Sequence, residues 1–96
     1  MHHNPEGIGE FAALVGQEVV VDARASFLYI GTLESVGEDA VVLTDADVHS
    51  SEDSLTTREV YLLETRKNGI RPNRTRVYVM RREIVSISRL DDVMLY

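Results

Sequence analysis

Five short segments rich in β-branched and other apolar residues dominate this 96-residue chain. They span residues 19–24, 27–36, 40–48, 75–80 and 84–90. Five strands of this length cannot enclose a core as a flat sheet, so we expect a strongly bent sheet or a small barrel. A glycine inside the second segment, Gly31, indicates either a sharp bend or a close approach of another backbone.

The size of the chain allows one small domain, because 96 residues and 10.8 kDa bury only a modest core. We assign residues 1–9 to a flexible lead-in and residues 10–96 to this domain. The absence of cysteine excludes disulfides, zinc–thiolate sites and cysteine nucleophiles. No segment has the length of a membrane span or the pattern of a signal peptide, so a cytoplasmic protein without membrane contact is expected.

A short helix is predicted over residues 10–15, ahead of the first strand. Phe11, Leu14 and Val15 fall at the spacing of one helical face, and Gly16 follows as a C-terminal cap.

The segment between the third and fourth strands, residues 49–74, is predicted to be an inserted connection with its own helix. Thr56 stands three residues before Glu59, the spacing of a capping box at a helix start. The pair Asn68–Gly69 either ends this helix or forms the turn of a hairpin between residues 58–67 and 70–80. The helix is favoured because Leu, Glu, Arg and Lys dominate the segment.

Charge is distributed unevenly along a chain whose net charge is −6. Residues 1–65 carry −11, residues 66–82 carry +7 and the tail from Glu83 carries −2. The total argues against general affinity for nucleic acid. The basic block of residues 66–82 could nevertheless bind an anion or the acidic half of a neighbouring subunit.

Acidic and imidazole side chains alternate at the end of the third strand, in Asp45, Asp47 and His49, with Asp53 beyond. Such alternation would direct the first three to one face, where they could hold a divalent ion. An acidic strand end that contacts solvent or the basic block is the favoured interpretation, so no metal or cofactor is expected. No Ser–His–Asp setting, glycine-rich phosphate loop or metalloprotease helix is present, so the chain is not expected to be an enzyme.

The order of a helix, three strands, a helix and two strands resembles the plan of the Sm-like (LSm) family. Residues 14–21 are similar to the family's helix-to-first-strand junction, and residues 29–33 to its second strand with a bend-permitting glycine. Residues 41–46 and 79–87 are similar to its third strand and to its fourth-to-fifth strand passage. The resemblance implies a mainly β fold, a five-stranded strongly bent antiparallel sheet or small barrel. An N-terminal helix precedes it, and an inserted helix lies between the third and fourth strands.

The base-binding motifs of the Sm-like family are only partly present in this sequence. The loop that follows the second strand, residues 36–40, contains Asp39 but lacks the Asn with which the family's Asp helps to bind a uracil-like base. The family's Arg–Gly pair would align with Met80–Arg81 or with Arg81–Arg82, and neither arginine is followed by glycine. The uridine pocket therefore cannot be transferred residue by residue.

The resemblance implies assembly of identical chains into a closed ring, with the fourth strand of one subunit paired to the fifth strand of the next. Ring closure would remove two exposed sheet edges. The residues that we expect at the contact between subunits are Val77, Val79, Ile84, Ile87 and Leu90.

Single-stranded RNA is the candidate partner besides the chain itself. Arg81 and Arg82 lie at the tight turn that the family directs toward the ring pore, where repeated arginines would concentrate positive potential. With Asp39 they form the candidate RNA site, and Arg74 and Arg76 could add a basic outer surface.

The other interpretation is that these arginines pair with Asp or Glu of the same or an adjacent chain. In that case the chain would form a structural or protein-interaction ring that does not bind RNA. Tyr61 and Tyr78 are the nearest aromatic residues that could stack on bases, although such tyrosines more often pack in a core or an interface.

Overall fold

The computed structural model describes residues 8–50 and 57–94. The elements in chain order are α1 (Ile8–Ala12), β1 (Glu18–Ala23), β2 (Phe27–Val36), β3 (Ala40–Ser50), α2 (Arg58–Asn68), β4 (Arg74–Met80), the 3-10 turn η2 (Arg81–Glu83), β5 (Ile84–Arg89) and the 3-10 turn η3 (Leu90–Asp92). None of the helices within these ranges is long and apolar enough to cross a membrane.

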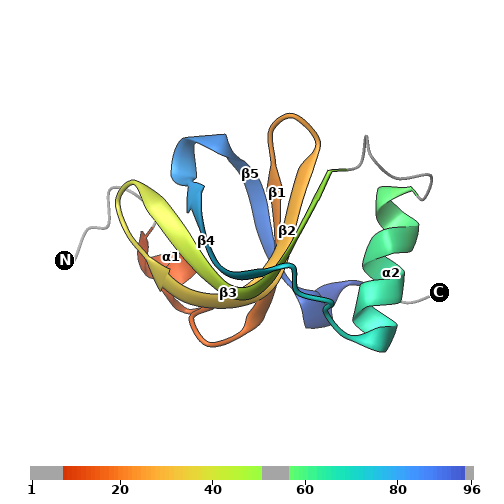
Figure 1. Cartoon of the computed structure of the whole chain (residues 1–96). Coiled ribbons are helices and arrows are strands. Elements are labelled where there is room, and N and C mark those ends of the chain that lie inside the picture. The colour runs from red at the N-terminus through yellow and green to blue at the C-terminus, as the bar shows by residue number, and fades with distance from the viewer. Residues whose placement is uncertain (1–7, 51–56, 95–96) are drawn as a thin grey trace.

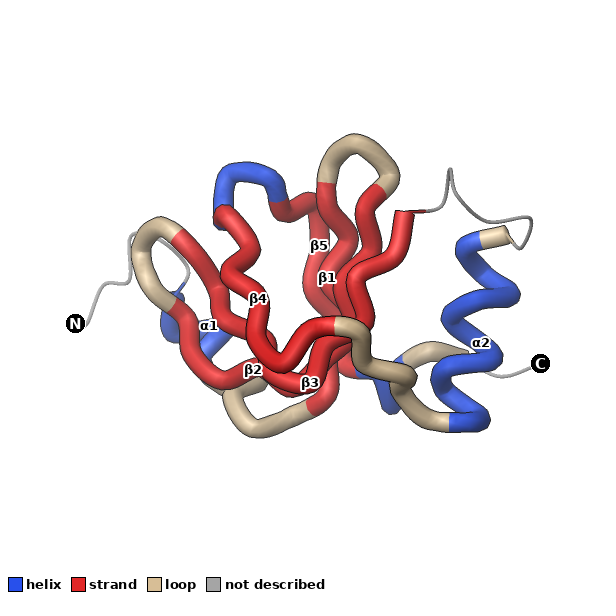
Figure 2. The backbone as a smooth tube through the Cα atoms, viewed as in Figure 1, coloured by secondary structure: helices blue, strands red, loops and turns tan. Residues whose placement is uncertain are grey.

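The strands form one five-stranded antiparallel sheet in the order β4-β3-β2-β1-β5. Strong curvature brings its two edge strands, β4 and β5, to the same side, where η2 joins them (Figures 1 and 2). The predicted bent antiparallel sheet, with one helix before it and one between the third and fourth strands, is therefore confirmed.

Gly31 lies where β2 and β3 come unusually close. A Cβ atom at this position would stand 3.0 Å from the Cα and Cβ of Ala46 and from the carbonyl oxygen of Thr44. The β2–β3 register shifts at this point, between Ile30 and Thr32. Of the two roles predicted for Gly31, the close approach of another backbone is thus observed directly.

Two apolar clusters make up the core, one on each side of β1. Val19 and Val21 belong to a cluster with Leu33, Val41, Leu43, Ala46 and Val79 inside the curved sheet. Val20 belongs to the second cluster, with Leu28, Ile30, Leu62 and Leu90. Because α2 and η3 cover the outer side of the sheet there, β1 is buried on both faces.

The N-terminal helix is shorter than predicted and is shifted toward the chain start. It covers Ile8–Ala12 instead of residues 10–15, and turns occupy residues 13–16. It therefore begins inside the segment assigned to the lead-in. Gly16 ends the turn region with a φ of +89°, a conformation that favours glycine.

The inserted helix α2 is confirmed, and the hairpin alternative is wrong. Its N-cap is Thr57, whose side chain accepts a hydrogen bond from the Val60 amide. The predicted cap, Thr56, lies outside the described residues. Gly69 ends the helix with a φ of +91° and donates its N–H to the Thr65 carbonyl.

Candidate nucleic-acid interface

The turn between β2 and β3 and the 3-10 turn η2 lie against each other. The Arg81 amide donates a hydrogen bond of 2.9 Å to the Asp39 carbonyl oxygen. The Arg81 guanidinium donates to the carbonyl oxygens of Gly37 and Glu38, over 3.4 and 3.2 Å. The structure therefore brings together Arg81 and Asp39, two of the predicted site residues.

The two arginines of η2 have different surroundings. The Arg81 guanidinium lies 5.9 Å from the centre of the Phe11 ring of α1, within the range of a cation–π contact. The Arg82 side chain is 82% exposed, and its guanidinium lies 3.9 Å from the Glu83 carboxylate. Arg82 is thus the cation of η2 that faces solvent, whereas Arg81 fastens η2 to its neighbours.

The other predicted cations, Arg74 and Arg76, lie at the far end of β4. About 20 Å separates the start of this strand from Arg81, given the rise of a β-strand. Arg76 pairs with Glu34 of β2 at 2.6 Å, and the hydrogen bond and charge of Glu34 raise the pKa of Arg76. Arg74 donates to the carbonyl oxygen of Asn73. The five predicted residues therefore do not form a single patch.

The residues predicted at subunit contacts differ in accessibility. Val79 and Leu90 are only 2% and 3% exposed, because they pack in the core of their own chain. Val77, Ile84 and Ile87 are half-buried against the inner cluster. The apolar side chains that the edge strands leave exposed are Tyr78, Met80 and Val85. The alternation of side chains along a strand could have predicted this exposure. Each of the three residues is next in sequence to a residue that faces inward.

Of the acidic and imidazole side chains of β3 predicted to share one face, Asp47 and His49 both contact Tyr61, and Asp45 does not join them. Asp45 adopts a φ of +48° and is exposed, whereas both Ala46 and Asp47 are buried. This irregularity interrupts the alternation of the strand. Within residues 8–50 and 57–94, no three His, Asp or Glu side chains lie close enough to hold a metal ion. Asp53 lies outside these ranges.

Asp47 instead contacts the inserted helix. It is 4% exposed and accepts hydrogen bonds from the Tyr61 hydroxyl and, at 3.4 Å, from the Asn73 amide. Burial and the hydrogen bond to Asp47 raise the pKa of Tyr61, which stays neutral at physiological pH. The Tyr61 ring also stacks on His49, with centroids 3.9 Å apart. Tyr61 therefore packs against β3, as tyrosines on amphipathic elements commonly do.

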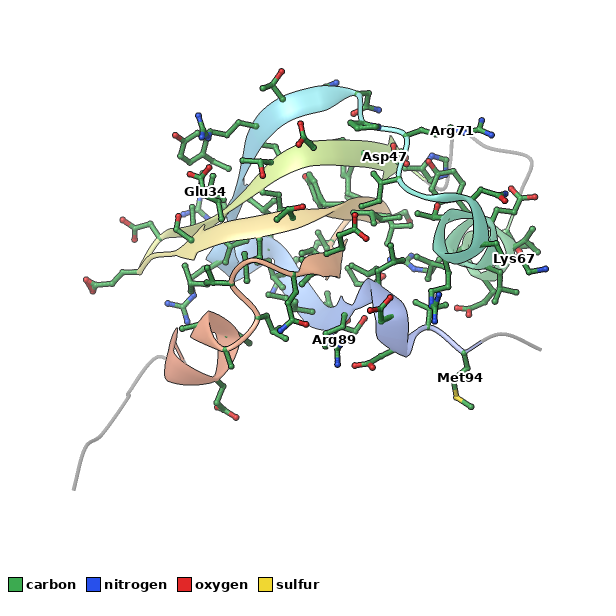
Figure 3. The ribbon with its side chains drawn as sticks, turned by 90° about the horizontal axis from the view of Figure 1, so that it is seen from below. Glu34, Asp47, Lys67, Arg71, Arg89 and Met94 are labelled. Carbon is green, nitrogen blue, oxygen red and sulfur yellow. The ribbon has the colours of Figure 1, made fainter. Side chains whose placement is uncertain are left out.

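A polar cavity of about 210 Å³ opens beside this contact. Its walls are formed by Asp47, Tyr61, Glu64, Thr65, Asn68, Gly69 and Arg71. Figure 3 shows Asp47 and Arg71 on the same side of the molecule, next to α2. Sequence reasoning did not find this cavity, because it arises only when α2 folds onto the end of β3.

Comparison with known proteins identifies the fold through solved structures, but it assigns no family from the sequence. No family model and no curated protein matches the sequence. Among solved structures, an Sm protein of Pyrococcus abyssii in complex with a uridine heptamer matches with a TM-score of 0.59. It is 16% identical, and the match covers 91% of this chain and 99% of that protein. The chain has an Sm-like fold.

Two further solved structures agree with the Sm-like fold. A Sm-like archaeal protein of Pyrobaculum aerophilum matches at a TM-score of 0.56 and 24% identity over 85% of this chain. The Sm-like chain described here spans about half of that protein, 49% of its length. A chain from the NatC complex bound to CoA matches at a TM-score of 0.55 and 14% identity, over 93% of this chain and 88% of its own.

Proposed function

We propose that this Sm-like chain assembles edge to edge with copies of itself into a ring. The observation that carries the proposal is the strand order, in which β4 and β5 are the two edge strands of the curved sheet that the described residues form. Pairing β4 of one subunit with β5 of the next would satisfy both edges and use the same contact at each step. Exposed Tyr78 and Met80 on β4 and Val85 on β5 are apolar side chains suited to such a contact.

We further propose that the ring binds single-stranded RNA through η2 and the adjoining β2–β3 turn, by binding alone and without catalysis, in the cytoplasm. Arg82 would be the main cation, because its guanidinium is largely exposed. Arg81 would hold η2 in place through Gly37 and Glu38. A uridine heptamer bound to the Pyrococcus abyssii Sm protein, which shares this fold, supports the proposal.

A structural ring without RNA is the second candidate. Arg76 is paired with Glu34, and the Arg81 guanidinium is engaged by backbone carbonyls. The net charge of −6 also opposes attraction of a polyanion at long range. These contacts favour the interpretation in which the arginines serve the fold itself.

The decisive experiment combines two measurements on the full chain. Native mass spectrometry gives the mass of the assembly. Fluorescence anisotropy with labelled oligo-U and oligo-A, at about 50 and 200 mM salt, gives RNA affinity. The proposal predicts a closed oligomer whose RNA binding weakens with salt, and a loss of about tenfold in affinity for Arg82→Ala. Lys67→Ala, which removes the same charge from exposed α2, should bind RNA like the unmodified chain.

Each outcome selects one interpretation. An oligomer without RNA binding at low salt would leave the structural ring. Equal losses for Arg82→Ala and Lys67→Ala would mean that binding is not centred on η2. A monomer would contradict both candidates.

A further inference from the structure

The cavity is lined by residues of α2. This helix lies at the opposite end of the molecule from the β2–β3 turn (Figure 1). Liquid water occupies about 30 Å³ per molecule, so about 210 Å³ equals the volume of roughly seven waters. That is enough for a planar group the size of a nucleobase. Because the cavity is lined mainly by polar side chains, a ligand there must bring matching donors and acceptors.

Asp47 is the feature of this cavity that most needs a partner. A carboxylate at 4% exposure is costly unless its oxygens are hydrogen-bonded or paired with a cation. Among the described residues, its two oxygens receive one hydrogen bond each, from neutral Tyr61 and neutral Asn73, and no ion pair. Since a carboxylate can accept about four hydrogen bonds, each oxygen retains one acceptor position. Two adjacent donors on a ligand would match them.

Arg71, an exposed cation that lines the cavity, favours an anionic group on the ligand. It lines the same space as Tyr61, and its positive charge acts to lower the pKa of the Tyr61 hydroxyl. An arginine at this position suits a phosphate and repels a cationic ligand. The ligand should therefore combine two neighbouring N–H donors with an anionic group.

We propose that this cavity binds a guanine base whose phosphate reaches Arg71, either as a free nucleotide or within single-stranded RNA. Guanine carries N1–H and the N2 amino group side by side, the donor pair that a carboxylate accepts. Uracil presents a single N–H flanked by two carbonyl oxygens, which a carboxylate repels. Adenine and cytosine place a ring acceptor beside their amino group. Asn68 offers an amide donor for guanine O6, and Glu64 offers acceptors for the ribose hydroxyls.

Calorimetric titration of the full chain with mononucleotides tests the assignment. GMP should bind about tenfold more tightly than IMP, which lacks the N2 amino group, and at least tenfold more tightly than AMP or UMP. Asp47→Asn should weaken GMP binding by tenfold or more. Equal affinity for GMP and UMP would overturn the proposal, as would tighter binding of L-arginine, which offers the same donor pair. No binding of GMP at about 5 mM would also overturn it.

Arg71→Ala keeps the test valid if Asp47→Asn disturbs folding, because Arg71 is exposed. This variant should lower the affinity for GMP to that for guanosine and leave guanosine binding unchanged. Lys67→Ala removes a charge from the last turn of α2, four residues before Arg71, without lining the cavity and should leave GMP binding unchanged. Equal GMP binding by Arg71→Ala and Lys67→Ala would contradict the role of Arg71.

Binding of short RNA oligonucleotides distinguishes the two possible ligands, a guanine within single-stranded RNA and a free guanine nucleotide. If the site serves RNA, UUGUU should bind more tightly than GMP, and Asp47→Asn should remove its advantage over UUUUU. If it serves a free nucleotide, GMP should bind and UUGUU should gain nothing over UUUUU. Mononucleotide binding requires neither the ring nor η2, so Arg82→Ala should leave it intact. Failure of the guanine site and failure of the proposed RNA-binding ring are therefore distinguishable.

Discussion

At the scale of single residues, the sheet depends on the close packing of Gly31 against Ala46. The contact joins two strands at the point where their register shifts. Any side chain at residue 31 must displace the backbone of β3, because two of the three nearest atoms are backbone atoms. Close packing of this kind cannot be relieved by moving the end of a flexible side chain.

Gly31→Ala is therefore expected to lower the free energy of unfolding by about 1–3 kcal/mol. Urea denaturation followed by circular dichroism measures the change. Gly37→Ala is the matched control, since a Cβ there would meet only the Ala40 carbonyl oxygen at 3.4 Å. A loss at residue 31 no larger than that at residue 37 would contradict the packing argument.

At the scale of elements, α2 is held to the sheet by few contacts. Leu62 inserts into the outer apolar cluster with Val20 and Leu28. Arg58 forms an ion pair with Asp22 of β1, and Tyr61 donates to Asp47. The helix is also the wall that closes the candidate guanine site, so its attachment controls that site.

Leu62→Ala should lower the free energy of unfolding by about 2 kcal/mol, the lower part of the range for a core leucine, because α2 lies at the edge of the core. Hydrogen exchange should show the loss mainly in α2 amides, with β1–β3 still protected. Val60→Ala, on the exposed side of α2, is the control and should cost less than about 0.5 kcal/mol. Unchanged protection of α2 in Leu62→Ala would show that other contacts hold the helix.

At the scale of the whole molecule, two unpaired sheet edges define what the chain can assemble into. A single curved sheet with free edges at β4 and β5 can pair head to tail with identical neighbours. Because Val79 and Leu90 are occupied by the core, the side chains available to a neighbour are those on the exposed side of the edges.

Val85→Lys should reduce the proposed ring to single chains, because a lysine on an edge strand opposes pairing with another strand. The side chain is 70% exposed, so the fold itself should keep its stability. Met94→Lys also replaces an exposed apolar side chain, here 71% exposed, with lysine, but outside the edge strands. It should leave the mass of the assembly unchanged. Native mass spectrometry compares the two, and an unaltered oligomer in Val85→Lys would place the contact elsewhere.

The sequence by itself determined the elements and the curvature of this protein. Strand alternation, Gly31 and the Asn68–Gly69 helix end are local properties, because they depend on backbone preferences over a few residues. They predicted five strands, a bent sheet and the inserted helix, and only element ends such as the Thr57 cap and the limits of α1 were misplaced.

Only the tertiary structure decided which side chains are accessible and which meet. A one-residue irregularity at Asp45 separated this residue from Asp47 and His49, which both contact Tyr61 of α2, because a strand's faces exchange with each residue. Arg81 became a link between η2 and the β2–β3 turn, and the guanine-sized cavity formed, through contacts between residues far apart in sequence. Local periodicity carries no information about such contacts, since they depend on how whole elements pack.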